Sequence, residues 1–197
     1  MLVFAMSHRK IGNMITYGNP HSDADLHRIL ALQKANLPAY INAAEVQAEG
    51  FVTVDHNYAV LKAMNHPYPH VIARDGNEVV GYTLVMLRSF QNQVPELMPM
   101  FEEFNSTLYR NRPLSEINYF VMGQVCVAKG YRGRGLFQGL YAQMKRQMAL
   151  EFEAIVTEIA LNNPRSLRAH EKVGFKTIKE YQSADGVDWA IVLWDWG

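Results

Sequence analysis

The sequence lacks the features that mark several common protein classes. One cysteine, Cys126, in 197 residues excludes an internal disulfide framework, and no Cys/His spacing is typical of a zinc or other metal site. Lysines plus arginines equal aspartates plus glutamates at 19 each, so the formal net charge is zero. This balance gives no indication that nucleic acid or an anionic membrane is a partner.

Long hydrophobic runs are also absent. No apolar segment approaches the length of a membrane span, and residues 1–6 are too short for the core of a signal peptide. We therefore expect a cytoplasmic protein without a membrane partner. A chain of this length can bury one sizeable core. We expect one domain at residues 14–197, after a loose extension at residues 1–13.

The sequence that is present is organised around residues 118–152. Residues 118–127 are apolar and rich in β-branched and aromatic side chains, which predicts a buried strand. Three glycines follow within residues 130–135, and they indicate a sharply turning backbone. Residues 136–152 then carry an apolar side chain at every fourth position, which predicts one long amphipathic helix.

A strand, a glycine loop and a helix in this order can bind an anion. The first N–H groups of a helix have no intrahelical partner and carry partial positive charge. Glycines before the helix let a phosphate approach these groups. Arg132 and Arg134 add full charges, and no Ser, Thr, Asp or Asn stands at the expected N-cap. The loop predicts a phosphate site, while a tight turn with two solvated arginines fits the same residues.

Periodicity and turn residues predict the other elements. Asp75-Gly76 between two β-rich runs is a strong hairpin signal. The expected strands are residues 14–17, 69–74, 79–87, 154–161, 175–181 and 188–196. The expected helices are residues 22–37, 41–50, 57–64, 96–109 and 164–174. Six histidines show no ligand spacing and are expected at the surface or in turns: His8, His21, His27, His56, His66 and His70.

Two motifs lie on either side of the expected strand at residues 154–161. The first is Arg132-Gly-Arg-Gly135 followed by Phe137, and the second is Asn163-x-x-Ser166-x-x-x-His170-x-x-x-Gly174-Phe175. Together they resemble the GNAT superfamily of acyl-CoA-dependent N-acyltransferases, over about residues 79–196. The family loop reads Arg/Gln-x-x-Gly-x-Gly/Ala, so Phe137 departs from it, and His170 stands where Tyr is commoner.

The resemblance implies an α/β (α+β) fold. We expect a mixed, mostly antiparallel twisted sheet with a central splayed pair of parallel strands and helices on both faces. Gly123, inside the central strand, predicts a bulge or a close backbone approach. Residues 91–117 are longer than the family needs and form an expected insertion near the acceptor side. They could cover the acceptor pocket, form a homodimer contact or simply pack as a surface helix.

The resemblance also implies acetyl-CoA as co-substrate and a small amine or a peptide amine as acceptor. In the family, the pantetheine arm bonds the backbone of the central strand and the pyrophosphate sits on the glycine loop. Cys126 is expected to be a core residue of the strand rather than a nucleophile. The residues expected to bind the coenzyme are Val125, Cys126, Val127, Arg132, Gly133, Arg134, Gly135, Leu136, Phe137, Gln138, Asn163 and Ser166.

Acyl transfer to an amine needs one group that takes a proton and another that gives one. Glu158 lies in an apolar strand, where burial raises the pKa of a carboxyl and makes it a better base. Some family members use a glutamate at this point. His170 can donate a proton near neutral pH and occupies the position of the family's usual tyrosine acid. A paired or capping Glu158 and a hydrogen-bonded core His170 are the structural alternatives.

Two further functions fit parts of the pattern. A non-catalytic module of the same fold would bind acyl-CoA without turnover. A dinucleotide-binding oxidoreductase would also place Gly133-x-Gly135 between a strand and a helix. Too few residues follow Gly135 for two mononucleotide-binding halves, and no Asp ends the next strand to hold a ribose.

Overall fold

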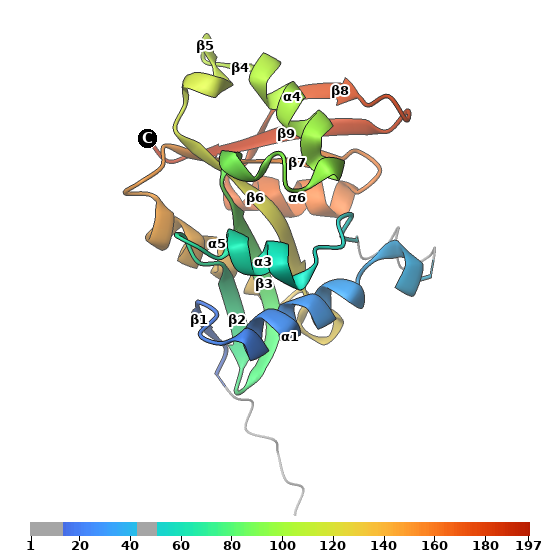
Figure 1. Cartoon of the computed structure of the whole chain (residues 1–197), viewed down its shortest axis with the longest axis vertical. Coiled ribbons are helices and arrows are strands. Elements are labelled where there is room, and N and C mark those ends of the chain that lie inside the picture. The colour runs from blue at the N-terminus through green and yellow to red at the C-terminus, as the bar shows by residue number, and fades with distance from the viewer. Residues whose placement is uncertain (1–13, 43–50) are drawn as a thin grey trace, which may run out of the picture.

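The computed structural model of the protein describes residues 14–42 and 51–197 (Figure 1). The expected extension at residues 1–13, and residues 43–50 of the helix expected at 41–50, lie outside these ranges. The helices are α1 Asp23–Lys34, α3 Tyr58–Met64, α4 Met98–Ser106, α5 Leu136–Met148 and α6 Pro164–Val173. The strands are β1 Thr16–Gly18, β2 Val71–Asp75, β3 Glu78–Met86, β4 Leu108–Tyr109, β5 Arg112–Pro113, β6 Tyr119–Val127, β7 Ala154–Ala160, β8 Lys176–Gln182 and β9 Asp188–Asp195.

Seven strands form one mixed sheet in the order β1-β2-β3-β6-β7-β9-β8. Every neighbouring pair is antiparallel except β6 and β7, which are parallel and connected through α5. A β-strand, helix, β-strand crossover of this kind is the usual way to join parallel strands. The expected fold class is confirmed, including the hairpin at Asp75-Gly76 and the central parallel pair.

A bulge in β6 occurs at the expected glycine. Leu84 of β3 pairs with Gln124 and Val85 pairs with Met122, which leaves Gly123 as the extra residue. A Cβ on Gly123 would lie 3.3 Å from the Met64 side chain, so the helix side of the sheet also leaves little room there. The bulge reorients β6 just before its last residues, where the strand parts from β7.

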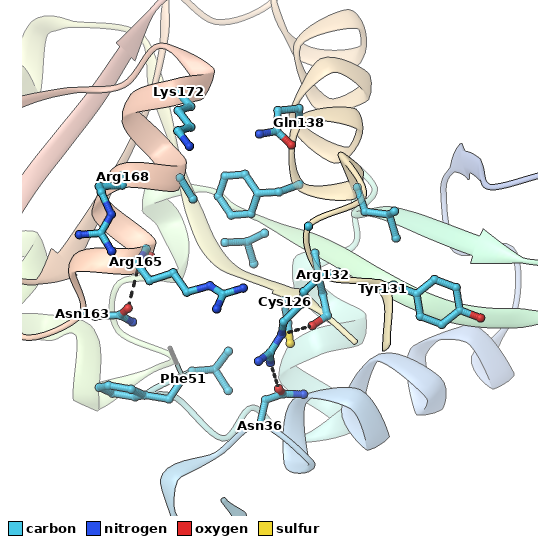
Figure 2. A pocket seen from close by; sticks show the side chains of 18 of the residues that line it. Asn36, Phe51, Cys126, Tyr131, Arg132, Gln138, Asn163, Arg165, Arg168 and Lys172 are labelled. Carbon is cyan, nitrogen blue, oxygen red and sulfur yellow. Dashed lines mark hydrogen bonds between the residues drawn. The ribbon is translucent and has the colours of Figure 1, made fainter. Parts of the chain in front are cut away.

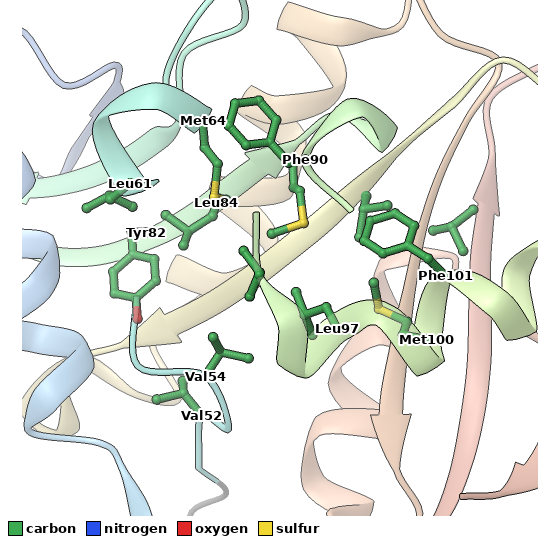
Figure 3. Close-up of a cluster of buried hydrophobic side chains, with 14 of the residues drawn as sticks. Val52, Val54, Leu61, Met64, Tyr82, Leu84, Phe90, Leu97, Met100 and Phe101 are labelled. Atoms are coloured by element: carbon green, nitrogen blue, oxygen red, sulfur yellow. The ribbon is translucent and has the colours of Figure 1, made fainter. Parts of the chain in front are cut away.

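Helices cover both faces of the sheet (Figure 1). One core lies between the sheet and helices α1, α3 and α4, and Figure 3 shows part of it around Tyr82, Leu84 and Met100. The other lies between the sheet and α5, with Leu140, Met144 and Met148 fully buried. Alternate residues of the central strands face the two cores, as the period of a β-strand requires. No helix in the described ranges is long and apolar enough to cross a bilayer.

Two of the histidines expected at the surface or in turns are buried instead. His56 is 5% exposed and His70 is 0% exposed. The His70 ring bridges two backbone groups: Nε2 lies 3.1 Å from the Leu61 carbonyl, and Nδ1 accepts from the Val85 N–H at 3.0 Å. Burial lowers the pKa of His70 to about 3. A neutral imidazole has one donor and one acceptor, so it can satisfy two buried backbone groups that a spacing argument does not reveal.

The segment at residues 91–117 also differs from the single helix expected at 96–109. A short 3₁₀ turn at Pro95–Leu97 leads into α4, and α4 ends at Ser106. A two-residue turn follows at Arg110 and Asn111, whose φ angles of +49° and +61° suit a tight hairpin between β4 and β5. The helix packs onto the sheet through Phe101 and Phe104, which are buried in the core shared with α1 and α3.

Candidate active site

The sheet opens at its centre, between β6 and β7. The two strands pair only from Tyr119–Val121 to Ala154–Val156. One step further, the Thr157 hydroxyl donates to the Met122 carbonyl at 3.0 Å. Beyond this bond, no strand in the described ranges pairs with the edge of β6 that faces β7. A ligand that runs alongside such an edge can bond its N–H and C=O groups as a further strand would.

The glycine loop places the start of α5 beside this opening. Gly135 is the N-cap residue, with φ of +80° and no side-chain cap hydrogen bond. Gly133 also has a positive φ of +73°. A Cβ atom added at either glycine would have no neighbouring atom within 4 Å. The backbone therefore turns in a way that favours glycine and leaves open space over the first N–H groups of α5.

A cleft of about 580 Å³ connects the loop, the end of β6 and one face of α6 (Figure 2). Every residue expected to bind the coenzyme lines it, with the exception of Arg134. The cleft also contains residues that were not predicted: Asn36, Phe51, Val52, Tyr131, Arg165, Arg168, Ala169 and Lys172. Four of these residues lie on one face of α6, and their spacing of three and four residues in the sequence could have identified them. Asn36, Phe51 and Val52 are remote in the chain and gave no signal.

The two loop arginines have different surroundings. Arg132 Nε donates to the Val127 carbonyl at 3.0 Å, and its Nη2 donates to Asn36 Oδ1 at 2.5 Å. This side chain ties the end of β6 to the end of α1, as Figure 2 shows. Arg134 stacks over the Tyr131 ring at 5.4 Å, outside the cleft lining. The backbone N–H groups of the loop are therefore more open to an anion than these two guanidinium groups are.

The start and end of α6 are set by its own sequence. Asn163 Oδ1 accepts from the Ser166 N–H at 3.2 Å, which caps the helix, and Pro164 stands at the first helical position. Gly174 ends the helix with φ of +122°, and a Cβ there would lie 2.7 Å from Trp194 Nε1. Both the backbone angle and the close approach of Trp194 require glycine.

Glu158 lies half-buried on β7, at a small cavity of about 40 Å³ where β6 and β7 part. Burial raises the pKa of its carboxyl to about 7, and Glu103 adds to the shift. The Tyr181 hydroxyl donates to Glu158 Oε2 at 2.5 Å, which opposes the shift. The hydrogen-bond partner of this carboxyl is thus the hydroxyl of a tyrosine in β8. A carboxyl with a pKa near 7 is suited to act as a base.

His170 lies in the core beneath α6, and 1% of it is exposed. Nδ1 lies 2.8 Å from the Ser166 carbonyl, and Nε2 lies 2.7 Å from the Tyr141 hydroxyl. Because a carbonyl only accepts, Nδ1 carries the proton and Nε2 accepts from Tyr141. Burial lowers the pKa of His170 to about 4. The neutral ring lies outside the cleft lining, and its one ring proton is already bonded to the Ser166 carbonyl, so this arrangement does not favour the expected role as acid.

The two departures from the family motif contact each other. The rings of Phe137 and His170 meet edge to face, with centroids 5.0 Å apart. Phe137 also lines the cleft, so its ring stands between the cleft and the histidine. A small residue at position 137 would leave this side of His170 less covered.

The structure does not bring Glu158 and His170 together. The Glu158 side chain points to the same face of the sheet as Val156, whereas His170 packs with Tyr141 and Phe175 on the face covered by α5.

The charges around the opening indicate its ligand. Four cationic side chains and no carboxylate occur among the described residues that line the cleft. Such a lining suits a polyanion that carries phosphate groups. No group of three or more His, Cys, Asp or Glu residues in the described ranges could hold a metal ion. The site therefore combines an anion cleft with a single carboxyl of raised pKa.

Comparisons with known proteins agree with this geometry. The sequence profile of the Acetyltransferase (GNAT) family matches residues 26–175. No curated protein sequence matches the chain. Three solved structures share the fold at low identity, and each is matched over nearly its whole length.

The first is the ribosomal-protein-S18-alanine N-acetyltransferase from Escherichia coli, with 12% identity, 92% of this chain and 94% of that chain covered, and a TM-score of 0.57. The second is a chain of the NatC complex bound to Gag peptide and CoA, with 15% identity, 93% and 99% covered, and a TM-score of 0.63. The third is a putative acetyltransferase from Salmonella typhimurium with its cofactor acetyl-CoA, with 16% identity, 94% and 95% covered, and a TM-score of 0.60.

The sheet has one parallel pair rather than the doubly wound parallel sheet of a dinucleotide-binding oxidoreductase, so that alternative is set aside. The family profile covers the loop, the parting strands and α6, which are the parts that build the cleft. The chain belongs to the Acetyltransferase (GNAT) family, the acetyl-CoA-dependent N-acetyltransferases.

Proposed function

We propose that this protein moves an acetyl group from acetyl-CoA to a primary amine by direct transfer within a ternary complex. The observation that carries the proposal is the Glu158 carboxyl, with a pKa raised to about 7, at the point where β6 and β7 part. Acetyl-CoA supplies, when bound, a thioester whose carbonyl carbon is open to attack by an amine. The protein has to hold that ligand, deprotonate the amine and exclude other nucleophiles.

The lining of the cleft supports binding of the coenzyme. The backbone N–H groups at Gly133–Gln138 would hold the diphosphate of CoA, because Gly135 leaves space for the phosphates and no side chain caps the helix. The pantetheine arm would lie along the unpaired edge of β6 near Val125 and Val127. Val127 offers fewer free groups than the family suggests, because its carbonyl already accepts from Arg132. Asn163 and Ser166 also line the cleft.

Glu158 is the proposed base. A carboxyl whose pKa is about 7 is partly deprotonated at neutral pH, so it can take a proton from an ammonium group. Tyr181 holds one carboxylate oxygen and leaves the other for the acceptor. Trp189, Leu97 and Met100 form an apolar rim around the cavity, which limits the space next to the carboxyl.

His170 takes a different part in this proposal. The ring links the Ser166 carbonyl to the Tyr141 hydroxyl and so fixes α6 against α5. Because α6 carries Asn163 and Ser166 to the cleft, His170 acts on the site through their position. Ser166 Oγ lies 3.4 Å from His170 Nδ1 but the shorter contact of that nitrogen is with the Ser166 carbonyl, at 2.8 Å.

The test is turnover with acetyl-CoA against a panel of amines. The panel contains amino acids, polyamines, aminoglycosides and peptides with free N-termini, and the peptides come first because two of the structural neighbours act on or bind proteins and peptides by their titles. Acetylated product with release of free CoA thiol supports the proposal. CoA binding without turnover of any amine would instead indicate the non-catalytic acyl-CoA-binding module.

A further inference from the structure

The cavity at Glu158 differs from the coenzyme cleft in the charge of its lining. Among the described residues that line the cavity there is no lysine, arginine or histidine, and Glu158 is the one charged side chain. The rest of this lining is two threonines, one glycine and apolar side chains. An amine that enters the cavity therefore meets a carboxyl and apolar surface, and an acidic group on the same molecule meets no cation.

Most of the side-chain donors at the cavity are already in use. The Thr157 hydroxyl donates to the Met122 carbonyl at 3.0 Å. The indole N–H of Trp189 donates to Ser183 Oγ at 3.1 Å. Among the described lining residues, Thr53 carries the remaining side-chain hydroxyl. One hydroxyl does not compensate a carboxylate that leaves water, because a buried charge needs an opposite charge as well as hydrogen bonds.

The charges near the cavity also oppose an anion. Burial raises the pKa of Glu158, and the negative charge of Glu103 adds to this shift, so a second carboxylate acts on the same place. Lys179 of β8 is already paired with Glu103, with Nζ 2.7 Å from Oε2, and it also donates to Ser106 Oγ at 3.1 Å. The electrostatic field at the cavity therefore favours a cation over an anion.

An amine that reacts at Glu158 brings its own substituents close to that carboxyl. The amine nitrogen has to come within about 2.6–3.2 Å of the base. A carboxylate on the carbon that bears the amine would then have its oxygens within about 6 Å of Glu158. Glu158 acts as a base only when it is ionised, so the repulsion is largest in the catalytic form. Few water molecules fit in about 40 Å³, so they screen this repulsion weakly.

We propose that the acceptor is a primary amine whose carbon carries no carboxylate, so that free α-amino acids are excluded. This inference rests on the proposed function, because it defines the acceptor of that reaction. Leu97 and Met100, both labelled in Figure 3, border the cavity together with Trp189 and favour an uncharged substituent beside the amine. The N-terminus of a peptide and an aliphatic amine share this chemistry, and the experiment separates the two sources.

The experiment measures kcat/KM with acetyl-CoA for three amines of nearly the same shape: L-alanine, L-alaninamide and isopropylamine. They differ only in one substituent of the amine carbon, which is a carboxylate, a carboxamide or a methyl group. Values are compared per concentration of free amine, because the three amines differ in basicity. We expect L-alaninamide to exceed L-alanine by at least about 100-fold. The better of the two uncharged amines indicates whether a peptide N-terminus or an aliphatic amine is the source.

A variant pair tests the electrostatic reason. Thr53 lines the cavity and is exposed, so Thr53→Lys adds a cation there without burying it in the core. We expect this variant to raise kcat/KM for L-alanine relative to L-alaninamide by about tenfold. Thr53→Gln adds a long side chain without charge and should keep the wild-type ratio.

A wild type that uses L-alanine and L-alaninamide equally well would overturn the inference. A ratio that changes equally in Thr53→Lys and Thr53→Gln would overturn it too, because size rather than charge would then control the choice. The proposed function fails in a different way, as an absence of CoA thiol release with these three amines and with every other amine of the panel.

Discussion

The anion cleft and the cavity at Glu158 follow one another along β6, but they differ in size and in the residues that line them. The cleft of about 580 Å³ is lined by the glycine loop, four cations and several apolar side chains, whereas the cavity of about 40 Å³ is lined by one carboxyl, two threonines and apolar side chains. The cleft is ready for a large anion in the form described. The cavity has room for little more than the reacting group, so its chemistry depends on the raised pKa of Glu158 rather than on contact area.

This difference separates binding from chemistry. A substitution in the cleft should weaken the binding of the coenzyme and leave the pH dependence of acetyl transfer unchanged. A substitution at the cavity should change the pH dependence and leave the binding of the coenzyme unchanged. Five variants test this separation, in order of the expected size of the effect.

The largest effect is expected for Glu158→Gln. Loss of the base should lower kcat/KM by about 10²- to 10⁴-fold near pH 7.5, with CoA affinity unchanged. The wild-type kcat/KM should rise through a pKa of about 7, and the variant should lack this limb. At high pH the free amine supplies itself, so the defect should shrink. A pH–rate profile equal to the wild type would show that Glu158 is structural.

Glu158→Gln should also change the stability of the protein, and it should raise stability at high pH although it lowers activity. The folded pKa of Glu158 is raised from 4.5 to about 7, so the folded state holds this proton more tightly than the unfolded chain. That contribution to stability is complete below pH 4.5 and is lost as the pH rises through 7. Glu158→Gln carries no such charge, so it should melt above the wild type at pH 8. Thermal melts across this range also confirm that the variant folds.

The next effect is expected for Gly135→Glu, which places bulk and negative charge over the start of α5. The wild type should gain about 2.7 kcal/mol of stability at CoA concentrations a hundredfold above its dissociation constant. The variant should lose most of this gain. Gly186→Glu is the matched control, because Gly186 has a φ of +83° against +80° for Gly135 and also lies in open space. An undiminished CoA effect in Gly135→Glu would place the coenzyme elsewhere, and an equal loss in both variants would mean that backbone strain rather than the site causes the loss.

A smaller effect is expected for His170→Phe. The change leaves the Ser166 carbonyl and the Tyr141 hydroxyl without their partner, which should cost about 1–3 kcal/mol of unfolding free energy. We expect kcat to fall by less than about tenfold, below the range for a direct acid. Tyr141→Phe removes one of the same bonds and serves as comparison. A loss of kcat above a hundredfold in His170→Phe alone would restore the histidine as proton donor.

Tyr181→Phe should change the pH dependence without removing the base. The hydrogen bond from Tyr181 lowers the pKa of Glu158, so its loss should move the acidic limb of kcat/KM upward by roughly half to one unit. Tyr109→Phe is the control, since the Tyr109 hydroxyl bonds Asp195 at 3.0 Å rather than Glu158. An unmoved limb would mean that this hydrogen bond is absent in solution.

The smallest effect is expected for Cys126→Ala. Burial raises the pKa of the Cys126 thiol to about 12, so little thiolate exists at neutral pH. We expect kcat close to the wild-type value and initial-rate kinetics of a ternary complex. A ping-pong pattern together with an acetylated Cys126 detected by mass spectrometry would contradict direct transfer.

The sequence by itself determined the seven strands of the main sheet, the glycine loop and the limits of α6. These features depend on local chemistry: the positive φ of Gly135, the Asn163 cap and the period of apolar residues. The bulge at Gly123 was also readable, because glycine inside an apolar strand has few other uses. The raised pKa of Glu158 followed from its apolar neighbours on the same strand.

The tertiary structure alone decided which of these residues meet. It placed Asn36 and Phe51 in the cleft, turned Arg132 back onto Val127, and put His170 on the opposite side of the sheet from Glu158. It also gave Glu158 its Tyr181 partner, which lies 23 residues away in the chain. The periodicity of apolar residues predicts which face of a helix or strand is buried, but it does not predict which residue of another element contacts that face. Polar contacts such as these form only when the packed elements bury both partners together.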